Sequence, residues 1–343
     1  MRIIVTGHRG YIGTVLVPLL VAEGYHVVGV DSDLYKQCTF GEETGIASIP
    51  ELLKDIRDME AADVKGFDAV IHLAGLSNDP LGNLNPELTY EINHLASVRL
   101  ARLAKDAGVK RFIFSSSCSN YGAAGQDWVD EESTLNPLTP YGIAKVRVEE
   151  DVTKLADSSF CPVFPRNATA YGVSPRLRFD LVLNNLVAWA LATGKVHLKS
   201  DGSAWRPLVH IEDIASALMA ILQAPIERVY NQAFNVGQTA ENYRVRDLAE
   251  IVTETVPGSR IEFAEGASAD QRCYRVNCDK LEKAFPELGF KWNVKRGAEV
   301  LYKAYLKEGL KLEEFEGPKY KRVAHIQKLL ETGRLDETLR WKR

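Results

Sequence analysis

The sequence predicts an α/β fold in which a doubly wound parallel sheet carries a smaller, interleaved C-terminal lobe. Over the first 240 residues, short β-branched runs alternate with amphipathic stretches. The runs are apolar almost throughout, which is typical of parallel strands that are buried on both faces. Repeated alternation of strand and helix indicates a doubly wound sheet, and the loosening of this rhythm after residue 166 marks the second lobe.

The predicted elements follow in chain order. The strands are Arg2–Thr6, Tyr25–Val30, Asp68–Leu73, Arg111–Ser116 and Pro162–Arg166. The helices between them are Tyr11–Glu23, Pro86–Ala107 and Thr139–Leu155. A helix at Ile211–Gln223 and a strand at Ala233–Val236 return to the sheet, and from Gln238 onward we expect mostly polar helix. Residues 1–165 plus 207–237 therefore form the predicted sheet domain, and residues 166–206 plus 238–343 form the second lobe.

Composition excludes several classes of protein. With 45% hydrophobic and 26% charged residues, the 343-residue chain has enough apolar content to fold into a core. A net charge of −4 leaves no basic surplus for nucleic acid. No apolar run reaches the ~20 residues of a membrane span, and the N-terminus lacks signal-peptide features, so we expect a cytoplasmic protein. The five cysteines include no Cys-x-x-Cys pair, and neither a disulfide framework nor a metal site is expected.

Three glycines follow the first predicted strand directly, and a helix follows them. They lie in the segment Gly7–Gly13, which also contains Tyr11 and Ile12. One glycine permits the tight turn, one lets the backbone approach a pyrophosphate, and one, Gly13, lets the helix pack against the strand. The helix N-terminus then offers free N–H groups to the phosphates. This strand-turn-helix context indicates a Rossmann-like dinucleotide site, with Gly7, Gly10 and Gly13 at its centre.

Further residues of the same domain are expected to line the cofactor site. Asp31 ends the second strand, where a carboxylate accepts both hydroxyls of the adenosine ribose and repels a 2′-phosphate, so NAD is favoured over NADP. Asp55 and Ile56 follow a short third strand, which precedes the strand Asp68–Leu73, and are placed beside the adenine. At the end of the fourth strand, the small residues of the segment Leu73-Ala74-Gly75 let the backbone pass close to the cofactor.

A serine, a tyrosine and a lysine are expected to meet above the nicotinamide. Tyr141 and Lys145 lie one turn apart at the start of a helix, and the strand before it ends in Ser115–Ser117. Oxidation of a secondary alcohol needs a base for the hydroxyl proton, and a free tyrosine with a pKa near ~10 is a poor one. A lysine ammonium and an oxidised nicotinamide both lower that pKa.

Together these segments resemble the extended short-chain dehydrogenase/reductase family, and more narrowly its nucleotide-sugar epimerases and dehydratases. The resemblance covers the chain to about residue 310. It implies Ser117, Tyr141 and Lys145 as the catalytic residues, with Ser116 as the alternative serine. The implied cofactor-binding residues are Gly7, Gly10, Tyr11, Ile12, Gly13, Asp31, Asp55, Ile56, Leu73, Ala74, Gly75, Asn93, Ser115, Tyr141 and Lys145.

The second lobe shows the same resemblance. The segment Asn184–Leu186, the strand Trp205–His210 and the segment Asp270–Tyr274 are similar to those with which family members bind a sugar-nucleotide diphosphate. Guanidinium groups bind phosphate oxygens in a bidentate manner. The implied substrate-binding residues are Ser117, Cys118, Thr169, Asn185, Arg206 and Arg272. The expected partner is therefore a nucleotide-diphosphate sugar.

Departures from the family pattern narrow the range of reactions that this chain is expected to catalyse. The family's 4,6-dehydratases have an aspartate and a glutamate after the catalytic hydroxyl, and this chain has Cys118 and Ser119 there, which disfavours dehydration. Some 3,5-epimerases of the family use a cysteine near the position of Cys118 as acid or base. The alternative interpretation is that Cys118 is a small buried residue without a chemical role. Thr169 stands where family 4-epimerases often have asparagine, so the identity of the sugar stays open.

The leading interpretation is an NAD-dependent epimerase that acts through a transient 4-keto sugar. A one-way dehydrogenase or reductase, a 3,5-epimerase and a non-catalytic NAD-sensing regulator remain as alternatives. The resemblance also implies a homodimer that pairs through the helices Pro86–Ala107 and Thr139–Leu155. Their apolar side chains include Leu95, Val98, Leu103 and Val148. The charged tail 313–343 is either a solvated helix or an oligomer arm.

Overall fold

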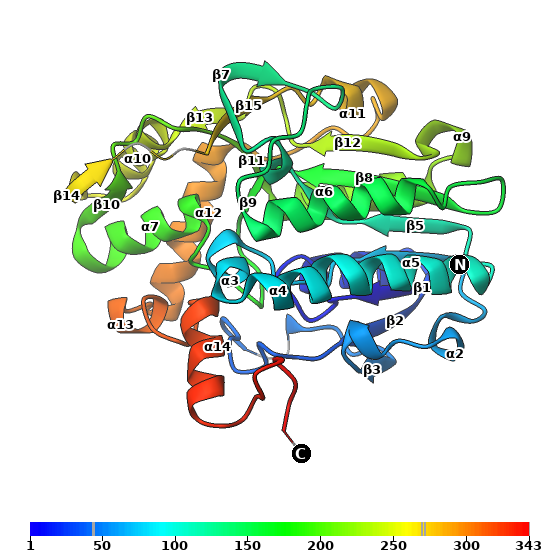
Figure 1. The fold of residues 1–343 in the computed structure, drawn as a ribbon. Helices are drawn as coiled ribbons and strands as arrows, with labels where there is room; N and C mark the ends of the chain where they lie inside the picture. The colour runs from blue at the N-terminus through cyan, green and yellow to red at the C-terminus, as the bar shows by residue number, and fades with distance from the viewer. Residues whose placement is uncertain (43–44, 269, 271, 343) are drawn as a thin grey trace.

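The protein is built on a central parallel sheet (Figure 1). The computed structural model describes residues 1–42, 45–268, 270 and 272–342. Within these residues the sheet has eight strands in the order β12-β8-β5-β4-β1-β2-β3, with β6 beside β8, and every pair is parallel. Its strands are β1 (Arg2–Thr6), β2 (His26–Asp31), β3 (Glu51–Leu53), β4 (Ala69–His72), β5 (Arg111–Phe114), β6 (Ser116–Ser117), β8 (Cys161–Asn167) and β12 (Gln232–Val236). The predicted doubly wound sheet is confirmed.

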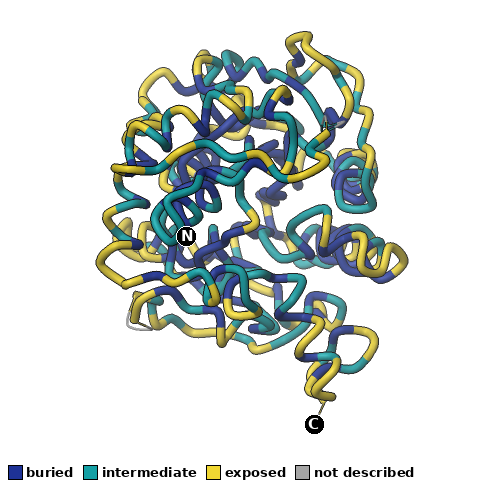
Figure 2. Tube along the Cα trace, turned by 90° about the vertical axis from the view of Figure 1, so that its left-hand side faces the viewer, coloured by how far each residue is buried: buried dark blue, intermediate teal, exposed yellow. Residues whose placement is uncertain are grey.

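Helices cover both faces of this sheet. Ile3 and Val5 point into a cluster with α1 (Gly13–Ala22) and α8 (Ile211–Gln223). Ile4 points into the opposite cluster, which the helices α2 (Ala61–Val64), α5 (Ala96–Asp106) and α6 (Pro140–Thr153) cover. Because successive side chains of a strand alternate between faces, burial of both faces requires the continuous apolar run seen in the sequence. Figure 2 shows the buried positions running through the interior of both parts of the molecule.

The predicted helix Pro86–Ala107 consists of three helical pieces. The helix α4 (Pro86–Thr89) continues into a π-helical segment, Tyr90–Leu95, and then into α5. A π-helical turn places side chains in directions that a regular helix cannot, and such turns are frequent at functional sites. The segment contains Asn93, which was predicted to belong to the cofactor site.

The second lobe contains more strand than the sequence predicted. Its three small sheets pair β9 (Thr169–Tyr171) with β11 (Trp205–His210) and β13 (Asn242–Arg244), β10 (Lys195–Ser200) with β14 (Arg260–Ser268), and β7 (Ala123–Val129) with β15 (Cys273–Val276). Helices α7 (Val182–Thr193), α10 (Val245–Thr255) and α12 (Val294–Glu308) pack around them. After Gln238 the regular structure is mostly helix, as predicted, but the prediction missed the strands β13, β14 and β15. The strand β14 is partly exposed along its length, so its sequence lacks the apolar run that marks a buried strand.

The C-terminal segment packs against the sheet domain, which corrects the predicted division of the chain. After α13 (Leu312–Phe315) and α14 (Arg322–Glu331), the chain buries Ile326, Leu329, Leu335 and Leu339 in one cluster with side chains of the sheet domain. Residues beyond about 320 therefore do not belong to the second lobe, and they are not a solvated helix. The last residue, Arg343, lies outside the described residues. The other short helices are η2 (Ile56–Asp58), α3 (Asp79–Leu84), η4 (Cys118–Tyr121), α9 (Ile226–Val229) and α11 (Asp279–Ala284).

The helices expected at a dimer interface bury most of the apolar residues that suggested it. Val98 and Val148 lie in the core of this chain, and Leu103 packs against the same core. Leu95 is 59% exposed. The homodimer therefore stays a prediction, and the burial of these side chains within one chain weakens the argument for it. No helix in the described part of the chain is long and apolar enough to cross a membrane.

Candidate active site

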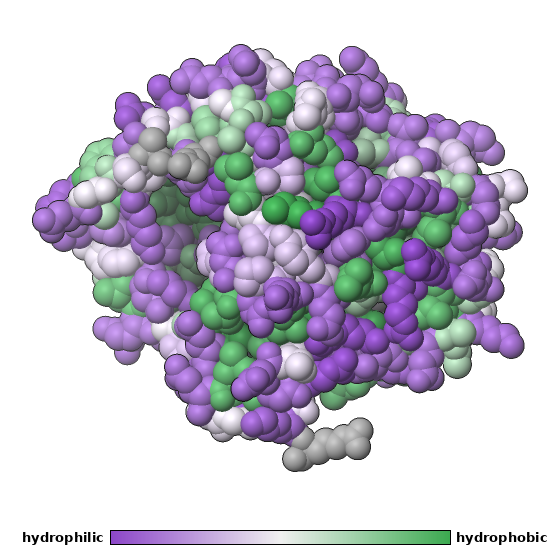
Figure 3. All heavy atoms as spheres, in the orientation of Figure 1, coloured by the Kyte–Doolittle hydropathy of each residue, from purple (hydrophilic) through white to green (hydrophobic). Residues whose placement is uncertain are grey.

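Two adjoining cavities lie at the carboxyl ends of the parallel strands, where doubly wound sheets bind their ligands. The smaller, of about 120 Å³, is lined by the glycine turn, and the larger, of about 620 Å³, extends toward the second lobe. Figure 3 shows a hollow on this face, left of centre. The cavities adjoin one another, because both are lined by Ile12, Leu73, Gly75, Leu76, Ser77 and Arg178.

The glycine turn of the smaller cavity has no room for side chains. Gly7 has φ +72°, and a Cβ there would lie 2.7 Å from the nitrogen of Ala74. A Cβ on Gly13 would lie 2.5 Å from the Gly7 oxygen, so the first helix packs directly onto the turn. Around Gly10 the only close neighbour is that same oxygen, at 3.0 Å, and its remaining side faces the cavity with Tyr11 and Ile12. The turn is shaped to receive a phosphate against its backbone.

Asp31 lines the smaller cavity as predicted. Its carboxylate accepts hydrogen bonds from the backbone N–H of Arg9 at 3.0 Å and of Asp33 at 2.8 Å. Burial raises the pKa of this carboxyl, and these N–H groups oppose that rise. The guanidinium of Arg9 is already held by Glu51 and by Asp33. Two carboxylates therefore neutralise the guanidinium of Arg9, which leaves it less available to a 2′-phosphate and fits a ribose diol better.

The rest of this cavity contains the predicted adenine-side residues. Asp55, Ile56 and the segment Leu73-Ala74-Gly75 all line it. Burial raises the pKa of Asp55, but its hydrogen bonds from Arg57 outweigh burial and the net pKa is lowered. Asn93 acts differently from the prediction, because its side-chain amide binds the main chain of Leu76. Its oxygen accepts from the Leu76 N–H at 2.7 Å, and its nitrogen donates to the Leu76 carbonyl at 2.9 Å. We assign Asn93 a supporting role for the loop that forms the cavity wall.

The predicted serine, tyrosine and lysine converge on the larger cavity. Thr139 caps the helix α6 by accepting from the Gly142 N–H at 3.2 Å, so Tyr141 and Lys145 occupy its first turns. The Tyr141 and Ser117 side chains share a hydrogen bond. The Lys145 ammonium donates to the Ser115 carbonyl at 2.6 Å, and Ser115, Ser117, Tyr141 and Lys145 all line the cavity. The alternative serine, Ser116, also lines it, but its hydroxyl donates to Glu149 at 2.5 Å.

Burial sets the electrostatics of this trio. It raises the pKa of Tyr141 to about 12, and the hydrogen bond from Ser117 opposes the rise. It lowers the pKa of Lys145 to about 7, and Glu149 opposes the fall. The Lys145 nitrogen lies 4.3 Å from the centre of the Phe114 ring and 5.8 Å from that of the Tyr141 ring. Tyrosine is thus protonated in the resting site, and a cation added beside it would lower its pKa.

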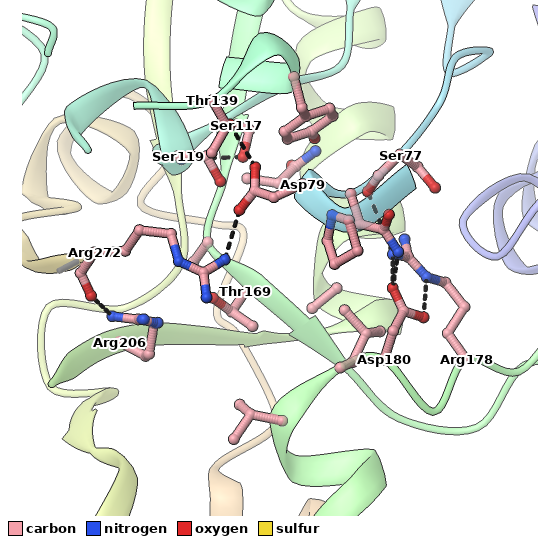
Figure 4. Close-up of a pocket in the computed structure, with 18 of the residues that line it drawn as sticks. Ser77, Asp79, Ser117, Ser119, Thr139, Thr169, Arg178, Asp180, Arg206 and Arg272 are labelled. Carbon is pink, nitrogen blue, oxygen red and sulfur yellow. Dashed lines mark hydrogen bonds and ion pairs between the residues drawn. The ribbon is translucent and has the colours of Figure 1, made fainter. Parts of the chain in front are cut away.

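The two predicted arginines meet on one wall of the larger cavity (Figure 4). Asp270 binds both of them, at 2.7 Å from Arg206 and 2.8 Å from Arg272. Arg272 also pairs with Asp79 at 2.6 Å, whose other oxygen accepts from Thr139 at 2.6 Å. Its side chain is 43% exposed, so it can reach a ligand in the cavity. Gln271 of the predicted motif lies outside the described residues.

Of the other residues predicted to bind the substrate, some line the larger cavity and one does not. Thr169 and Asn185 line the larger cavity. Cys118 lies outside both cavities as the described residues define them, with 1% of its surface exposed and its thiol 3.2 Å from the Arg166 carbonyl oxygen. Burial raises the pKa of this thiol well above its usual range. The structure therefore corrects the assignment of Cys118 to the substrate site, because η4 turns it into the core and leaves Ser119 facing the cavity.

Sequence reasoning missed several cavity residues. Arg178, which lines both cavities, is held by the carboxylate of Asp180 at 2.5 Å and 3.0 Å. Arg322 and Leu339 reach the smaller cavity from the C-terminal segment. Arg178 follows the proline- and glycine-rich stretch after β9, which was the available signal. For Arg322 the sequence offered none, since its position depends on how the tail returns.

The site fits an organic dinucleotide rather than a metal. No group of three or more His, Cys, Asp or Glu side chains in the described part of the chain is arranged to hold a metal ion. The smaller cavity instead offers a glycine turn for phosphates and a carboxylate for a ribose diol. Ser117, Tyr141 and Lys145 line the neighbouring cavity, toward which the nicotinamide end of a dinucleotide would extend.

Sequence comparison identifies relatives of the whole chain. The family model described as "NAD dependent epimerase/dehydratase family" matches residues 3–237. A UDP-glucose 4-epimerase of Bacillus subtilis (strain 168) is 29% identical over 329 residues, which cover 88% of this chain and 94% of that protein. A UDP-glucose 4-epimerase of Homo sapiens is 27% identical, over 76% of this chain and 84% of that protein.

Comparison with solved structures gives the same picture of the fold. MoeE5 in complex with UDP-glucuronic acid and NAD is 26% identical, with a TM-score of 0.76 over 90% of this chain and 100% of that one. The structure of TunA, an NAD-dependent NDP-hexosamine 5,6-dehydratase, has a TM-score of 0.78 at 24% identity, over 89% and 98% of the two chains. The latter likeness shows the fold alone.

Proposed function

This chain belongs to the NAD-dependent epimerase/dehydratase family, and on that premise we propose that it is an NAD-dependent nucleotide-sugar 4-epimerase. The observation that carries the proposal is the position of Tyr141. Tyr141, beside Ser117 and one turn from Lys145, lines the larger cavity, which adjoins the glycine-turn cavity. A sugar hydroxyl in the larger cavity would thus lie between a proton acceptor and a cofactor ring. The curated relatives named as UDP-glucose 4-epimerases support the same reaction.

The residues around the smaller cavity fit the family's cofactor. Gly7, Gly10 and Gly13 would hold the pyrophosphate, and Asp31 the adenosine ribose. When bound there, NAD supplies a hydride acceptor that later returns the hydride. Lys145 and Ser115 lie at the wall where the cofactor's reactive end would sit.

The chain's own residues then move one proton. Tyr141 accepts the proton of the sugar C4 hydroxyl, while Ser117 hydrogen-bonds the reacting oxygen and fixes its direction. Burial places the resting Tyr141 pKa at about 12, so the tyrosine needs positive charge nearby to act as a base. The Lys145 ammonium supplies part of that charge. After the transient 4-keto sugar has rotated so that its other face meets the hydride, Tyr141 returns the proton to the C4 oxygen.

Arg206 and Arg272 would hold the nucleotide diphosphate. Both line the larger cavity, and Asp270 keeps them side by side. The reacting sugar carries no charge, so much of the positioning free energy must come from this remote part of the substrate. Phosphate oxygens would replace Asp79 or Asp270 as partners of Arg272. Thr169 and Asn185 lie on the same cavity and are assigned to the sugar-nucleotide.

Dehydration and 3,5-epimerisation need an additional acid and base, and no carboxylate that lines the cavity within the described residues is free of an arginine partner. Among the described residues that line it, the carboxylates are Asp79, Asp180 and Asp270, and each is bound to an arginine. Cys118 lies outside the cavity, and Ser119 is a poor acid. The reaction proposed here needs only Tyr141 as a proton carrier. A non-catalytic regulator would not need this tyrosine and lysine.

The test is to incubate the protein with UDP-glucose, and then with other nucleotide sugars, and to follow the products by NMR. Epimerisation gives a mixture of the substrate and its C4 epimer with no net change in absorbance of reduced nicotinamide. Reduced cofactor in proportion to product would show a one-way dehydrogenase. A product lighter by one water would show a dehydratase. Either of the last two results would contradict the proposal.

We also propose that the enzyme is a cytoplasmic homodimer. All five cysteines are unpaired, as expected in a reducing compartment. The exposed Leu95 lies on the helical segment that family members use for pairing, although its neighbours are buried within this chain. Sedimentation that shows only monomer at micromolar concentration would contradict the dimer.

A further inference from the structure

The C-terminal segment forms part of the wall of the cofactor cavity. Arg322 and Leu339 line that cavity, and α14 packs against α3 beside it. Hydrogen bonds fasten the segment to the loop that follows Asp31, from His325 to the Leu34 carbonyl at 2.9 Å and from Trp341 to the Ser32 carbonyl at 2.6 Å. Four apolar side chains of the segment are buried against the sheet domain. The segment is therefore fixed in place, and the direction of Arg322 is defined.

Arg322 is a buried cation without a carboxylate partner. The residue is 7% exposed, and its guanidinium donates to the Ser77 hydroxyl at 2.8 Å and lies 4.2 Å from the centre of the Tyr35 ring. No carboxylate among the described residues lies within ion-pair distance of it. Burial and the nearby Arg178 both lower its pKa. A buried charge of this kind is costly unless it is paired.

A second polar group of this wall also lacks a partner. The Tyr35 hydroxyl oxygen is buried and has no hydrogen-bond partner among the described residues, and Tyr35 lines the same cavity as Arg322. Buried polar groups in folded proteins are nearly always satisfied, so such a group calls for an explanation such as a ligand. The guanidinium and the phenol together offer donors to a ligand with acceptor oxygens.

The charges around Arg322 favour an anion in the cavity. Arg178 and Arg322 both line it, and Asp180, which acts on both through its charge, forms its ion pair with Arg178. One positive charge of these three groups therefore remains unpaired, and Gly10 and the start of α1 line the same cavity. A guanidinium binds two phosphate oxygens at once. Arg322 lines the smaller cavity and not the larger, so its ligand is a cofactor and not the nucleotide sugar.

We propose that Arg322 binds the pyrophosphate of the dinucleotide cofactor, and that the C-terminal segment 322–342 is part of the cofactor site. The glycine turn would hold the pyrophosphate from the backbone side, and Arg322, with Tyr35 beside it, would hold it from the other. This inference rests on the cofactor that belongs to the proposed function, but not on the identity of the sugar substrate. If the larger cavity failed to bind a nucleoside diphosphate, the proposed substrate would be wrong, but the role of Arg322 toward the cofactor would still stand.

The test compares Arg322→Met with Lys328→Met in the full-length protein after removal of bound nucleotide. Both variants lose one positive charge from α14, and Lys328 is exposed on the same helix. Calorimetry measures the affinity for NAD and for ADP-ribose, and competition with NAD measures the affinity for adenosine, which lacks phosphate. We expect Arg322→Met to weaken NAD and ADP-ribose roughly tenfold to a hundredfold and adenosine less than about threefold. Lys328→Met should change none of them.

Thermal unfolding of the nucleotide-free variants separates this role from a structural one. Since Arg322 lacks an anionic partner there, Arg322→Met should melt at the parent's temperature or above it. Arg322→Lys keeps the charge without the bidentate geometry and should weaken NAD less than Arg322→Met. Unchanged affinity of Arg322→Met for ADP-ribose would overturn the proposal. So would an equal loss of adenosine and ADP-ribose together with a lowered melting temperature, because Arg322 would then support the fold only.

Discussion

The two cavities are built by different means. The cofactor cavity is lined by one short stretch of backbone, where Gly7 and Gly13 have no room for a Cβ and Gly10 faces the cavity. The substrate cavity takes its far wall from charged side chains, with Arg206, Arg272 and Asp270 held by one another. The first is a fixed shape, and the second is a set of ion pairs that a ligand can replace. A backbone site is therefore sensitive to volume, and an ion-pair site to charge.

The proposed catalytic trio of Ser117, Tyr141 and Lys145 lines the larger cavity and shares features with both regions. Tyr141 and Lys145 are positioned by one capped helix, as the glycines are by one turn. Their protonation, however, is set by burial, which moves the two pKa values in opposite directions, to about 12 and about 7. The trio thus combines local geometry with an environment that the whole fold creates. Variants of each region should fail in distinguishable ways.

The largest expected effect belongs to the trio. Tyr141→Phe should lower kcat by roughly a thousandfold, because the ring keeps its packing and only the proton-transfer group is lost. Nucleoside diphosphate and NAD should bind within a few-fold of the parent, which a titration of each ligand checks. A loss of activity of less than about tenfold would show that the base lies elsewhere.

The next effect tests whether the cofactor site is limited by volume. Gly7→Ala must adopt φ +72° and place a Cβ 2.7 Å from the Ala74 nitrogen, whereas Gly24→Ala at φ +79° meets no atom within 4 Å. We expect Gly24→Ala to cost about 1–2 kcal/mol and Gly7→Ala about 1–3 kcal/mol more. Urea unfolding measures both.

The same pair should separate in cofactor binding. Gly7→Ala shifts the turn away from the phosphates and should weaken NAD at least tenfold, while Gly24→Ala leaves the affinity as it is. Equal stability of the two variants, or unchanged NAD affinity of Gly7→Ala, would contradict the close approach described for this turn.

The substrate cavity should respond to charge instead. Arg272→Ala and Arg206→Ala should each weaken nucleoside diphosphate about ten- to a hundredfold, since each removes a charge-assisted contact. Affinity for NAD should hardly change. Arg260→Ala removes an exposed arginine of the same lobe and serves as the control. If both cavity variants bind nucleoside diphosphate like the parent, the proposed substrate class is wrong.

The smallest effect concerns a residue that lies outside both cavities. Cys118→Ala removes a buried thiol and should cost about 1 kcal/mol of stability, with kcat and KM near those of the parent. Steady-state kinetics beside a denaturant melt checks this. A loss of activity that exceeds the loss of folded protein would return Cys118 to the catalytic machinery.

What could be predicted from the sequence was local in the chain. The turn Gly7–Gly13, Asp31, and the pair Tyr141 and Lys145 each depend on spacing within a strand-turn-helix unit, and backbone geometry transmits such spacing directly into space. The parallel strands were equally legible, because burial on both faces leaves a continuous apolar run. Arg206 and Arg272 were found only through the resemblance, since nothing in their spacing of 66 residues links them.

Tertiary packing alone decided the rest. Whether Cys118 or Ser119 faces the cavity depends on the direction in which η4 leaves the sheet, and a difference of one residue is enough to reverse it. Strand β14 could not be recognised because a partly exposed strand carries no apolar run. Arg322 lies 245 residues from Ser77 in sequence and donates to it in space, because the tail buries four apolar residues on the sheet domain. The sequence determined which chemistry the chain carries, and long-range burial decided which of those side chains reach the ligands.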